Sequence, residues 1–241
     1  MEPNIIPIKR DFGRMEHLPR RSMNFMMGPL DMTMWSGFPE FLANQPKDKG
    51  ILFLPNHTSL CDPPTVDFAL TCLGLKPYYM ATAGLWQIPV INLVFIFGNF
   101  VKVHRNSSRA GAVVDIGTDL INSGKNVVMY PEGHIPKKED SGDYEPVSIK
   151  TGAARIYNNT GCSVVTIGQT GARKVSSGGR IKQVAGGATA RIRSPQRCVY
   201  VGEPMRGEPS GDIRRDTERI KASLTSSWQV AIDRRIELTS K

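Results

Sequence analysis

The sequence predicts a single α/β domain. Short apolar runs that suit strands alternate along the chain with longer segments whose apolar residues recur at helical spacing. The length of 241 residues fits one domain of this class. The hydrophobic fraction of 40% and the charged fraction of 22% exclude wholesale disorder and collagen-like or coiled-coil architectures. The chain contains no internal repeat and no linker long enough to separate two domains.

The elements expected first surround a polar turn. Residues 51–55 form an apolar run that predicts a buried strand, and residues 56–59 form the turn that follows it. Asp62, placed before Pro63 and Pro64, is expected to be the N-cap of a helix, because aspartate caps helices and proline suits the first turn. Two further strands are expected at residues 78–80 and 100–104.

The second half of the chain continues the alternation of helices and strands. Ser107 is expected to cap a helix that runs to about Asn122 and ends at Gly124. A helix with a broad apolar face should begin at Asp212 and run to about Ile236. Between these helices we expect a strand at 126–130, a polar loop at 132–145, a helix at 148–158, a strand at 163–168, a loop or hairpin at 171–187, and strands at 189–192 and 199–201.

The positive charge of the chain is concentrated in residues 146–202. This segment has no acidic residue and carries a charge equal to the whole net charge of +9. Such a segment favours an anionic partner: a phosphorylated substrate, an acidic lipid surface, an acidic carrier protein or a nucleic acid. Its basic residues are Lys150, Arg155, Arg173, Lys174, Arg180, Lys182, Arg191, Arg193 and Arg197.

The N-terminal region is rich in methionine and in charge. No stretch of the chain reaches the ~18–20 uninterrupted apolar residues of a membrane-spanning helix. The charged residues 1–22 contain no apolar core of a signal peptide. Half of the ten methionines lie at 23–34, before Trp35, where they suit either a lipid contact or a helix face packed on the core. We therefore separate an N-terminal apolar and basic segment, residues 1–48, as a candidate membrane contact, from a main domain at residues 49–241.

Cysteine and histidine spacing predicts no metal and no redox centre. The four cysteines form no C-x-x-C pair, and their sparse distribution fits reduced thiols. The four histidines show no metal-ligand spacing.

His57 and Asp62 are the first candidates for catalysis. An imidazole can accept a proton near neutral pH, and a carboxylate that holds it fixes its tautomer. On one helix the two side chains would lie ~140° apart, so the turn must fold Asp62 back toward His57. The alternatives are that Asp62 only caps a helix and that His57 is a solvated loop residue.

Three further residues are weaker candidates when each is taken alone. Glu132 lies in a tight turn at the end of a strand, where ligands collect in α/β sheets. Arg105 lies between a strand and a helix start, a place suited to gripping an anion. Lys150 opens the basic segment. Taken alone, each of them fits an ordinary surface residue better than a functional one.

Four blocks in order resemble the glycerophospholipid acyltransferase family, whose best-known members are lysophosphatidate acyltransferases. The blocks are NHTSLCD at 56–62, similar to N-H-x4-D, LWQIPVINLVFIFGNFVKVHR at 85–105, YPEG at 130–133 and KTGAAR at 150–155. The resemblance covers about half of the chain, residues 50–173. It implies a central mixed β-sheet flanked by helices, of the glycerol-3-phosphate (1)-acyltransferase type, and makes residues 49–241 the acyltransferase domain.

The resemblance also implies a reaction. A fatty acyl group would pass from acyl-CoA or acyl carrier protein, as co-substrate and without another cofactor, to the hydroxyl of lysophosphatidate, forming phosphatidate. His57 would be the general base and Asp62 would orient it. Backbone N–H groups near Gly133 are the candidate oxyanion donors, and an acyl-enzyme on Cys61 is the minor alternative. The expected substrate-binding residues are Asn56, Arg105, Glu132, Gly133, His134 and Lys150, with Glu132 on the acceptor hydroxyls and Arg105 and Lys150 on its phosphate.

Two departures from the family pattern concern the acceptor. The third block usually reads E-G-T-R-S, whereas here His134, Ile135 and Pro136 follow Glu132 and Gly133, so a phosphate-binding arginine is missing. Either His134 or a lysine at 137 or 138 would have to replace it. The fourth block, at 163–168, lacks the usual proline. Glycerol-3-phosphate, another lysophospholipid or a glycolipid are therefore alternative acceptors.

The remaining expectations concern partners and place. Both substrates are amphiphiles, so we expect a cytoplasmic protein, peripheral on the inner face of the cell membrane, that contacts an anionic lipid surface. A nucleic-acid-binding module around residues 171–197 is a weaker alternative. That segment has no aromatic residue to stack on bases, and no nucleic-acid partner is expected. A non-catalytic member of the family is the other alternative.

Overall fold

The computed structural model describes residues 5–8, 22, 25–82, 99–103, 110–135, 142–175, 186, 189–205 and 207–240. The expectations for Arg105, for the lysines at 137 and 138, and for most of the block at 85–105 lie outside these residues.

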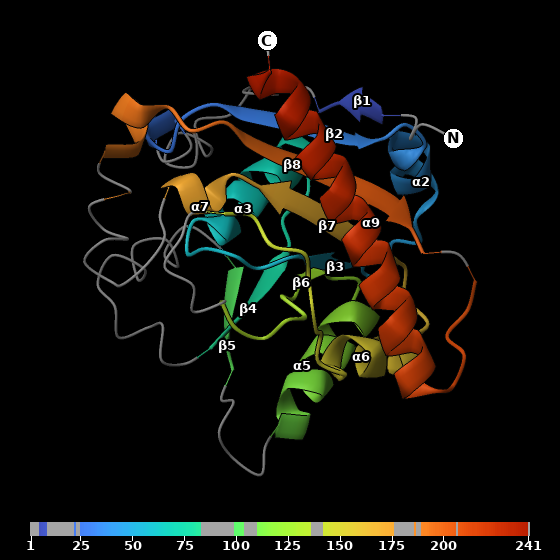
Figure 1. Ribbon diagram of the computed structural model, residues 1–241. Coiled ribbons are helices and arrows are strands. Elements are labelled where there is room, and N and C mark those ends of the chain that lie inside the picture. Colours follow the sequence, from blue (N-terminus) through green and yellow to red (C-terminus); the bar gives the residue numbers. More distant parts are fainter. Residues whose placement is uncertain are drawn as a thin grey trace.

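The described residues form one eight-stranded mixed sheet between two layers of helices (Figure 1). Five neighbouring strands, β7, β3, β6, β4 and β5, are parallel; β8 is antiparallel to β7, β2 is parallel to β8, and β1 is antiparallel to β2. In the order in which they lie, the strands are β1 (Ile5–Pro7), β2 (Leu30–Trp35), β8 (Arg197–Pro204), β7 (Val164–Thr170), β3 (Leu52–Pro55), β6 (Val127–Val128), β4 (Tyr78–Thr82) and β5 (Asn99–Val103). The predicted mixed sheet is confirmed.

The two faces of the sheet bury separate apolar cores. Side chains alternate along each strand: on β3, Phe53 packs into the core with α2 and α3, whereas Leu52 and Leu54 pack into the core with α5, α6 and α9. The long helix α9 crosses β7 and β8 diagonally (Figure 1). The helices are α2 (Phe38–Asn44), α3 (Asp62–Cys72), α5 (Ala110–Asn122), α6 (Gly152–Thr160), α7 (Ala172–Val175) and α9 (Ile213–Thr239). None of these helices combines the length and the apolar character that crossing a bilayer requires.

Most expected elements are present, with shifted ends. Asp212 caps α9 as predicted, because its carboxylate accepts the N–H groups of Arg214 and Arg215. The predicted cap at Asp62 is wrong: Cys61 is the N-cap, and Asp62 is the first residue of α3. The helix expected at 148–158 begins only at Gly152, so Lys150 precedes it. The strand expected at 126–130 is shorter in the structure, where it is β6.

The segment expected as a strand at 189–192 is helical over residues 189–193. A strand would place Ala190 and Ile192 on one face, whereas a helix separates them by ~200°. Ala190 is buried and Ile192 is exposed, as the helix requires.

The N-terminal segment contributes to the sheet, which the sequence did not indicate. Strand β2 lies between β1 and β8, and its Met32 and Met34 are buried in the core, as is Met27 just before it. Of the two alternatives, packing on the core holds for these three methionines and the lipid contact does not, although Met32 and Met34 lie on a strand and not on a helix face. Met26 is exposed, and the methionine at 23 lies outside the described residues.

The topology brings several loops to one edge of the sheet. The carboxyl ends of β3, β6 and β7 point the same way because these strands are parallel. Helix α3, after β3, packs on one face of the sheet, and α6, after β6, packs on the other. Neighbouring strands whose helices leave to opposite faces open a crevice at their carboxyl ends.

Candidate active site

His57 and Asp62 meet in the turn that follows β3. The Nδ1 atom of His57 lies 3.1 Å from Oδ2 of Asp62. The same carboxylate oxygen accepts the backbone N–H groups of Thr58 and of Ser59, the latter at 2.7 Å. Asp62 is buried, and His57 is nearly so. The turn thus folds the carboxylate back onto the imidazole, as the sequence spacing required.

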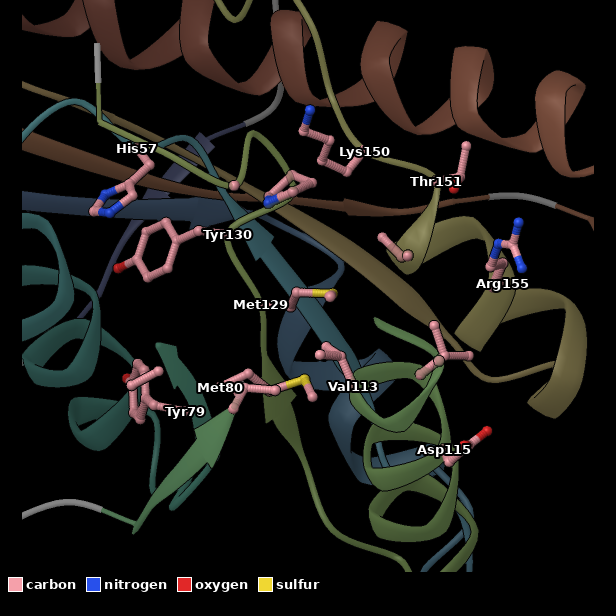
Figure 2. A pocket seen from close by; sticks show the side chains of 18 of the residues that line it. His57, Tyr79, Met80, Val113, Asp115, Met129, Tyr130, Lys150, Thr151 and Arg155 are labelled. Atoms are coloured by element: carbon pink, nitrogen blue, oxygen red, sulfur yellow. The ribbon is translucent and has the colours of Figure 1, made fainter. Parts of the chain in front are cut away.

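The pairing also determines which nitrogen of His57 can act as a base. A carboxylate only accepts hydrogen bonds, so the proton of the neutral imidazole belongs on Nδ1, where it donates to Asp62. The other nitrogen, Nε2, then carries the lone pair. His57 lines a cavity of about 780 Å³ (Figure 2), so its ring can meet a bound substrate.

Glu132, in the turn that follows the neighbouring strand β6, holds the backbone of His57. Its Oε1 accepts the N–H of His57 at 2.6 Å, and the side chain is buried. Burial raises the pKa of Glu132 to about 7; the hydrogen bond from His57 opposes this rise, and the charge of Asp62 adds to it. Glu132 is not among the residues that line the cavity.

Asn56 ties the catalytic turn to β7. Its Oδ1 accepts the N–H of Gln169 at 2.8 Å, and its Nδ2 donates to the carbonyl of the same residue at 3.1 Å. Gln169 in return donates its side-chain amide to the Asn56 carbonyl at 2.5 Å. Both ends of the Asn56 amide are therefore engaged within the protein, and Asn56 is not among the cavity-lining residues.

Arg173 is a buried residue at the site that the sequence did not indicate. Only 2% of it is exposed, and its Nη1 donates to the carbonyl of Thr58, inside the catalytic turn, at 3.2 Å. The guanidinium lies 5.0 Å from the ring centre of Tyr144. In the sequence Arg173 is only one of the residues of the basic segment. Its position shortly after an apolar strand is the single signal that could have indicated a place at the site.

Arg197, another member of the basic segment, is also buried. It donates to Thr65 Oγ1 at 2.7 Å and to the Gly28 carbonyl at 2.9 Å. Arg173 therefore supports the backbone of the catalytic turn, and Arg197 links α3 to the segment before β2. Neither residue presents its charge to solvent. The basic surface expected from the sequence is smaller by these two residues.

The cavity has an apolar wall and a polar rim. The ring of Tyr130 packs against that of His57, with ring centres 4.3 Å apart, and Figure 2 shows it directly beside the imidazole. Met80, Val113 and Met129 form part of the apolar wall, from β4, α5 and the end of β6. The rim on the α6 side carries Lys150, Thr151 and Arg155 (Figure 2). Lys150 and Arg155 are exposed.

Of the other residues expected at the site, some line the cavity and some do not. Gly133 lines the cavity at a φ of +73°, which favours glycine, but its N–H already donates to the Tyr130 carbonyl at 3.2 Å. The aliphatic stem of Lys150 passes over Gly133, where a Cβ would lie 3.3 Å from Lys150 Cγ. His134 is exposed, lies outside the cavity lining, and places Nδ1 3.1 Å from the Glu132 carbonyl. Cys61 also lies outside the lining.

No three histidine, cysteine, aspartate or glutamate side chains come together as a metal site in the part of the chain that the structure describes.

The fold and the site define a mixed α/β domain with a histidine–aspartate pair whose histidine lines a partly apolar cavity. A family model described as Acyltransferase matches residues 40–170, more than half of the chain. The chain belongs to this acyltransferase family, and the resemblance found in the sequence is confirmed. The matched segment contains His57, Asp62, Glu132 and Lys150.

Two relatives carry more specific names. The 1-acyl-sn-glycerol-3-phosphate acyltransferase of Borreliella burgdorferi is 23% identical over 154 residues, which are 61% of this chain and 58% of that protein. The chain thus spans less than two thirds of that relative. The crystal structure of the 1-acyl-sn-glycerophosphate (LPA) acyltransferase PlsC from Thermotoga maritima superposes with a TM-score of 0.54 at 19% identity, covering 94% of this chain and 79% of the other. At this identity the match shows a shared fold.

Proposed function

We propose that this protein transfers a fatty acyl group from an acyl thioester, acyl-CoA or acyl carrier protein, to the free hydroxyl of lysophosphatidate, forming phosphatidate. The observation that carries the proposal is the His57–Asp62 pair at the cavity. Membership in the acyltransferase family supports the class of reaction, and the names of the two relatives support the acceptor.

The geometry suits general-base catalysis. Nε2 of His57 takes the proton of the acceptor hydroxyl as its oxygen attacks the thioester carbonyl. The C–S bond of the tetrahedral intermediate then breaks, the thiolate leaves, and the imidazolium returns the proton to the sulfur. Asp62, held by two backbone N–H groups, stabilises the imidazolium between these steps. Cys61 lies outside the cavity lining, which favours direct transfer over an acyl-enzyme on that residue.

The cavity offers different surroundings to the two parts of an acyl-phosphate acceptor. Its apolar wall suits hydrocarbon, and the rim with Lys150 and Arg155 suits the phosphate, because both side chains are cations at neutral pH. These two residues are our candidates to replace the arginine that is missing from the third block. His134 is a weaker candidate, since it lies outside the lining. Arg105 stays a prediction from the sequence.

We further propose that the protein works as a peripheral protein on the cytoplasmic face of the membrane, because lysophosphatidate and long-chain thioesters are amphiphiles. The same catalytic pair would serve glycerol-3-phosphate, another lysophospholipid or a glycolipid. The departure at His134 keeps these acceptors as the alternative.

Thiol release from palmitoyl-CoA in the presence of lysophosphatidate tests the proposal. We expect acceptor-dependent release, reduced about 10²–10⁴-fold by His57→Ala, since general-base catalysis contributes that much. Arg214→Ala, on the exposed surface of α9, is the control and should retain the wild-type rate. Release that ignores lysophosphatidate but responds to another acceptor would transfer the proposal to that acceptor. Absence of release with every acceptor and donor would refute acyl transfer.

A further inference from the structure

The amino ends of β2 and β8 lie at the same edge of the sheet as the catalytic turn. Strands β2 and β8 run opposite to the parallel strands β7, β3 and β6. The residues that precede β2 and β8 therefore join the loops that follow β3, β6 and β7, where His57, Glu132 and Arg173 lie. In Figure 1 the blue segment before β2 and the orange helix before β8 lie beside each other at this edge.

Large apolar side chains are exposed on these two segments. Phe25 is 59% exposed, Met26 49% and Ile192 86%. Arg191 connects the segments, because its guanidinium carbon lies 4.1 Å from the ring centre of Phe25. Elsewhere in the described part of the chain only Val147 and Ile236 are large apolar residues with comparable exposure. We call Phe25, Met26, Lys174, Arg191 and Ile192 the edge patch.

The described residues of the segments that carry and adjoin these apolar side chains have charges of one sign. Lys174 and Arg191 are exposed, and the described residues of segments 25–28, 172–175 and 189–196 include no carboxylate. Arg193 is engaged differently: it donates to the carbonyls of Lys174, Val175 and Gly186, and so links the helix at 189–193 to α7. Exposed apolar side chains among cations are the combination that binds anionic lipid surfaces.

The segments that carry the edge patch pack against the catalytic turn through their buried residues. Met27, Val175 and Ala190, each next to a patch residue in the sequence, form a small buried cluster. Cys61, which lies between His57 and Asp62 in the sequence, packs against this cluster. A surface that binds the patch therefore also lies close to the edge of the sheet at which His57 lines the cavity.

We propose that the edge patch docks this protein on an anionic membrane surface, with Phe25, Met26 and Ile192 inserted between lipid headgroups and Lys174 and Arg191 on their phosphates. Docking turns the catalytic edge of the sheet toward the bilayer from which an amphiphilic substrate enters. The claim that this orientation serves catalysis rests on the proposed function, whereas the binding of the patch to lipid does not.

Co-sedimentation with vesicles tests the patch. The full chain is mixed with vesicles of phosphatidylcholine alone or with phosphatidylglycerol, and wild type is compared with Phe25→Ser/Met26→Ser/Ile192→Ser. We expect at least about a tenfold loss of affinity for the anionic vesicles in the triple variant. Val147→Ser/Ile236→Ser removes the two large apolar residues that are exposed outside the patch in the described part of the chain; it is the matched control and is expected to bind like wild type.

The charged part of the patch has its own variant. Lys174→Gln/Arg191→Gln should weaken binding to anionic vesicles and reduce its dependence on salt, because the released counterions and the attraction to headgroups both depend on these charges. Ile192→Ser alone serves if the triple variant does not fold, since this side chain is almost fully exposed. Wild-type affinity in the triple variant, or in Ile192→Ser if that is the variant that folds, would overturn the proposal, as would equal loss in the control pair.

A water-soluble substrate separates the patch from the reaction. With a short-chain acyl thioester and a short-chain acceptor, both below their aggregation limits, the triple variant should keep the wild-type rate. On vesicles containing long-chain acceptor its rate should fall together with binding. Patch-dependent vesicle binding without any acyl transfer would support the patch and refute the proposed reaction. Acyl transfer by the wild type, together with unchanged vesicle binding in the triple variant, would support the proposed reaction and refute the patch.

Discussion

Oδ2 of Asp62 lies 3.1 Å from Nδ1 of His57 and also accepts the backbone N–H groups of Thr58 and Ser59. Three donors thus converge on one buried oxygen at the start of α3. This convergence closes the turn between the two residues with hydrogen bonds. The carboxylate of Asp62 holds the imidazole, and two backbone N–H groups hold the carboxylate. The pair is therefore arranged before any substrate is present, which is the condition for efficient general-base catalysis.

Asp62→Asn tests this arrangement with nearly unchanged shape. The asparagine oxygen can still accept the N–H groups of Thr58 and Ser59, but it carries no charge to stabilise an imidazolium. We expect kcat to fall about 10²–10⁴-fold, measured as thiol release, with a smaller change in KM. Circular dichroism and thermal unfolding check that the variant is folded. A folded variant that retains the wild-type kcat would contradict the role of Asp62.

Arg173 should act as a positioning residue through the Thr58 carbonyl. Arg173→Met removes that donor, so the catalytic turn loses one support. We expect a lower kcat with a nearly unchanged KM, measured as thiol release, and partial rescue in Arg173→Lys. Arg197→Met is the matched control, because Arg197 is equally buried but bonds Thr65 and Gly28. It should lower stability, by about 1–3 kcal/mol, without lowering the kcat of the folded protein. An equal fall of kcat in both variants would reduce Arg173 to a structural residue.

Local patterns predicted the parts of the fold that local physics determines. The apolar run at β3, the apolar face of α9 and the cap at Asp212 all depend on residues near one another in the sequence. The histidine–aspartate pair was predictable for the same reason, since only five positions separate its members.

The supports of the site depend on contacts between distant residues. Asn56 and Gln169 are 113 positions apart, and Arg173 and Thr58 are 115 apart. Nothing near these residues in the sequence indicates the partner, because β7 comes to lie beside β3 only once the sheet has formed. The helix at 189–193 was missed for a related reason: which of its apolar residues is buried depends on the distant Met27 and Val175.

Glu132 predicts a change of stability with pH. Its pKa is about 7 in the folded protein, against an ordinary value of 4.5, because the side chain is buried. The stabilisation from its protonated form is full below about pH 4.5 and is lost as the pH rises through about 7, up to about 3 kcal/mol in all. Glu132→Gln cannot ionise and keeps an acceptor for the His57 N–H. The free energy of unfolding, measured in urea at about pH 5 and pH 8, should therefore rise for the variant relative to wild type at the higher pH. An equal difference at both values would contradict the raised pKa.

Gly168 allows α9 to lie directly on β7. A Cβ at this position would be 1.8 Å from the carbonyl oxygen of Ser227, a backbone atom that can move away only if the helix shifts. Gly168→Ala should therefore destabilise the protein by about 1–3 kcal/mol, measured by urea unfolding. Gly111→Ala is the control with the opposite sign: a Cβ there meets nothing within 4 Å, and alanine favours helix α5 by up to about 1 kcal/mol. Because α9 contacts β7 and β8 but does not line the cavity around His57 except at Ile213, the loss of stability in Gly168→Ala should exceed any loss of kcat at temperatures where the variant is folded. Unchanged stability in Gly168→Ala would show that α9 does not approach β7 this closely.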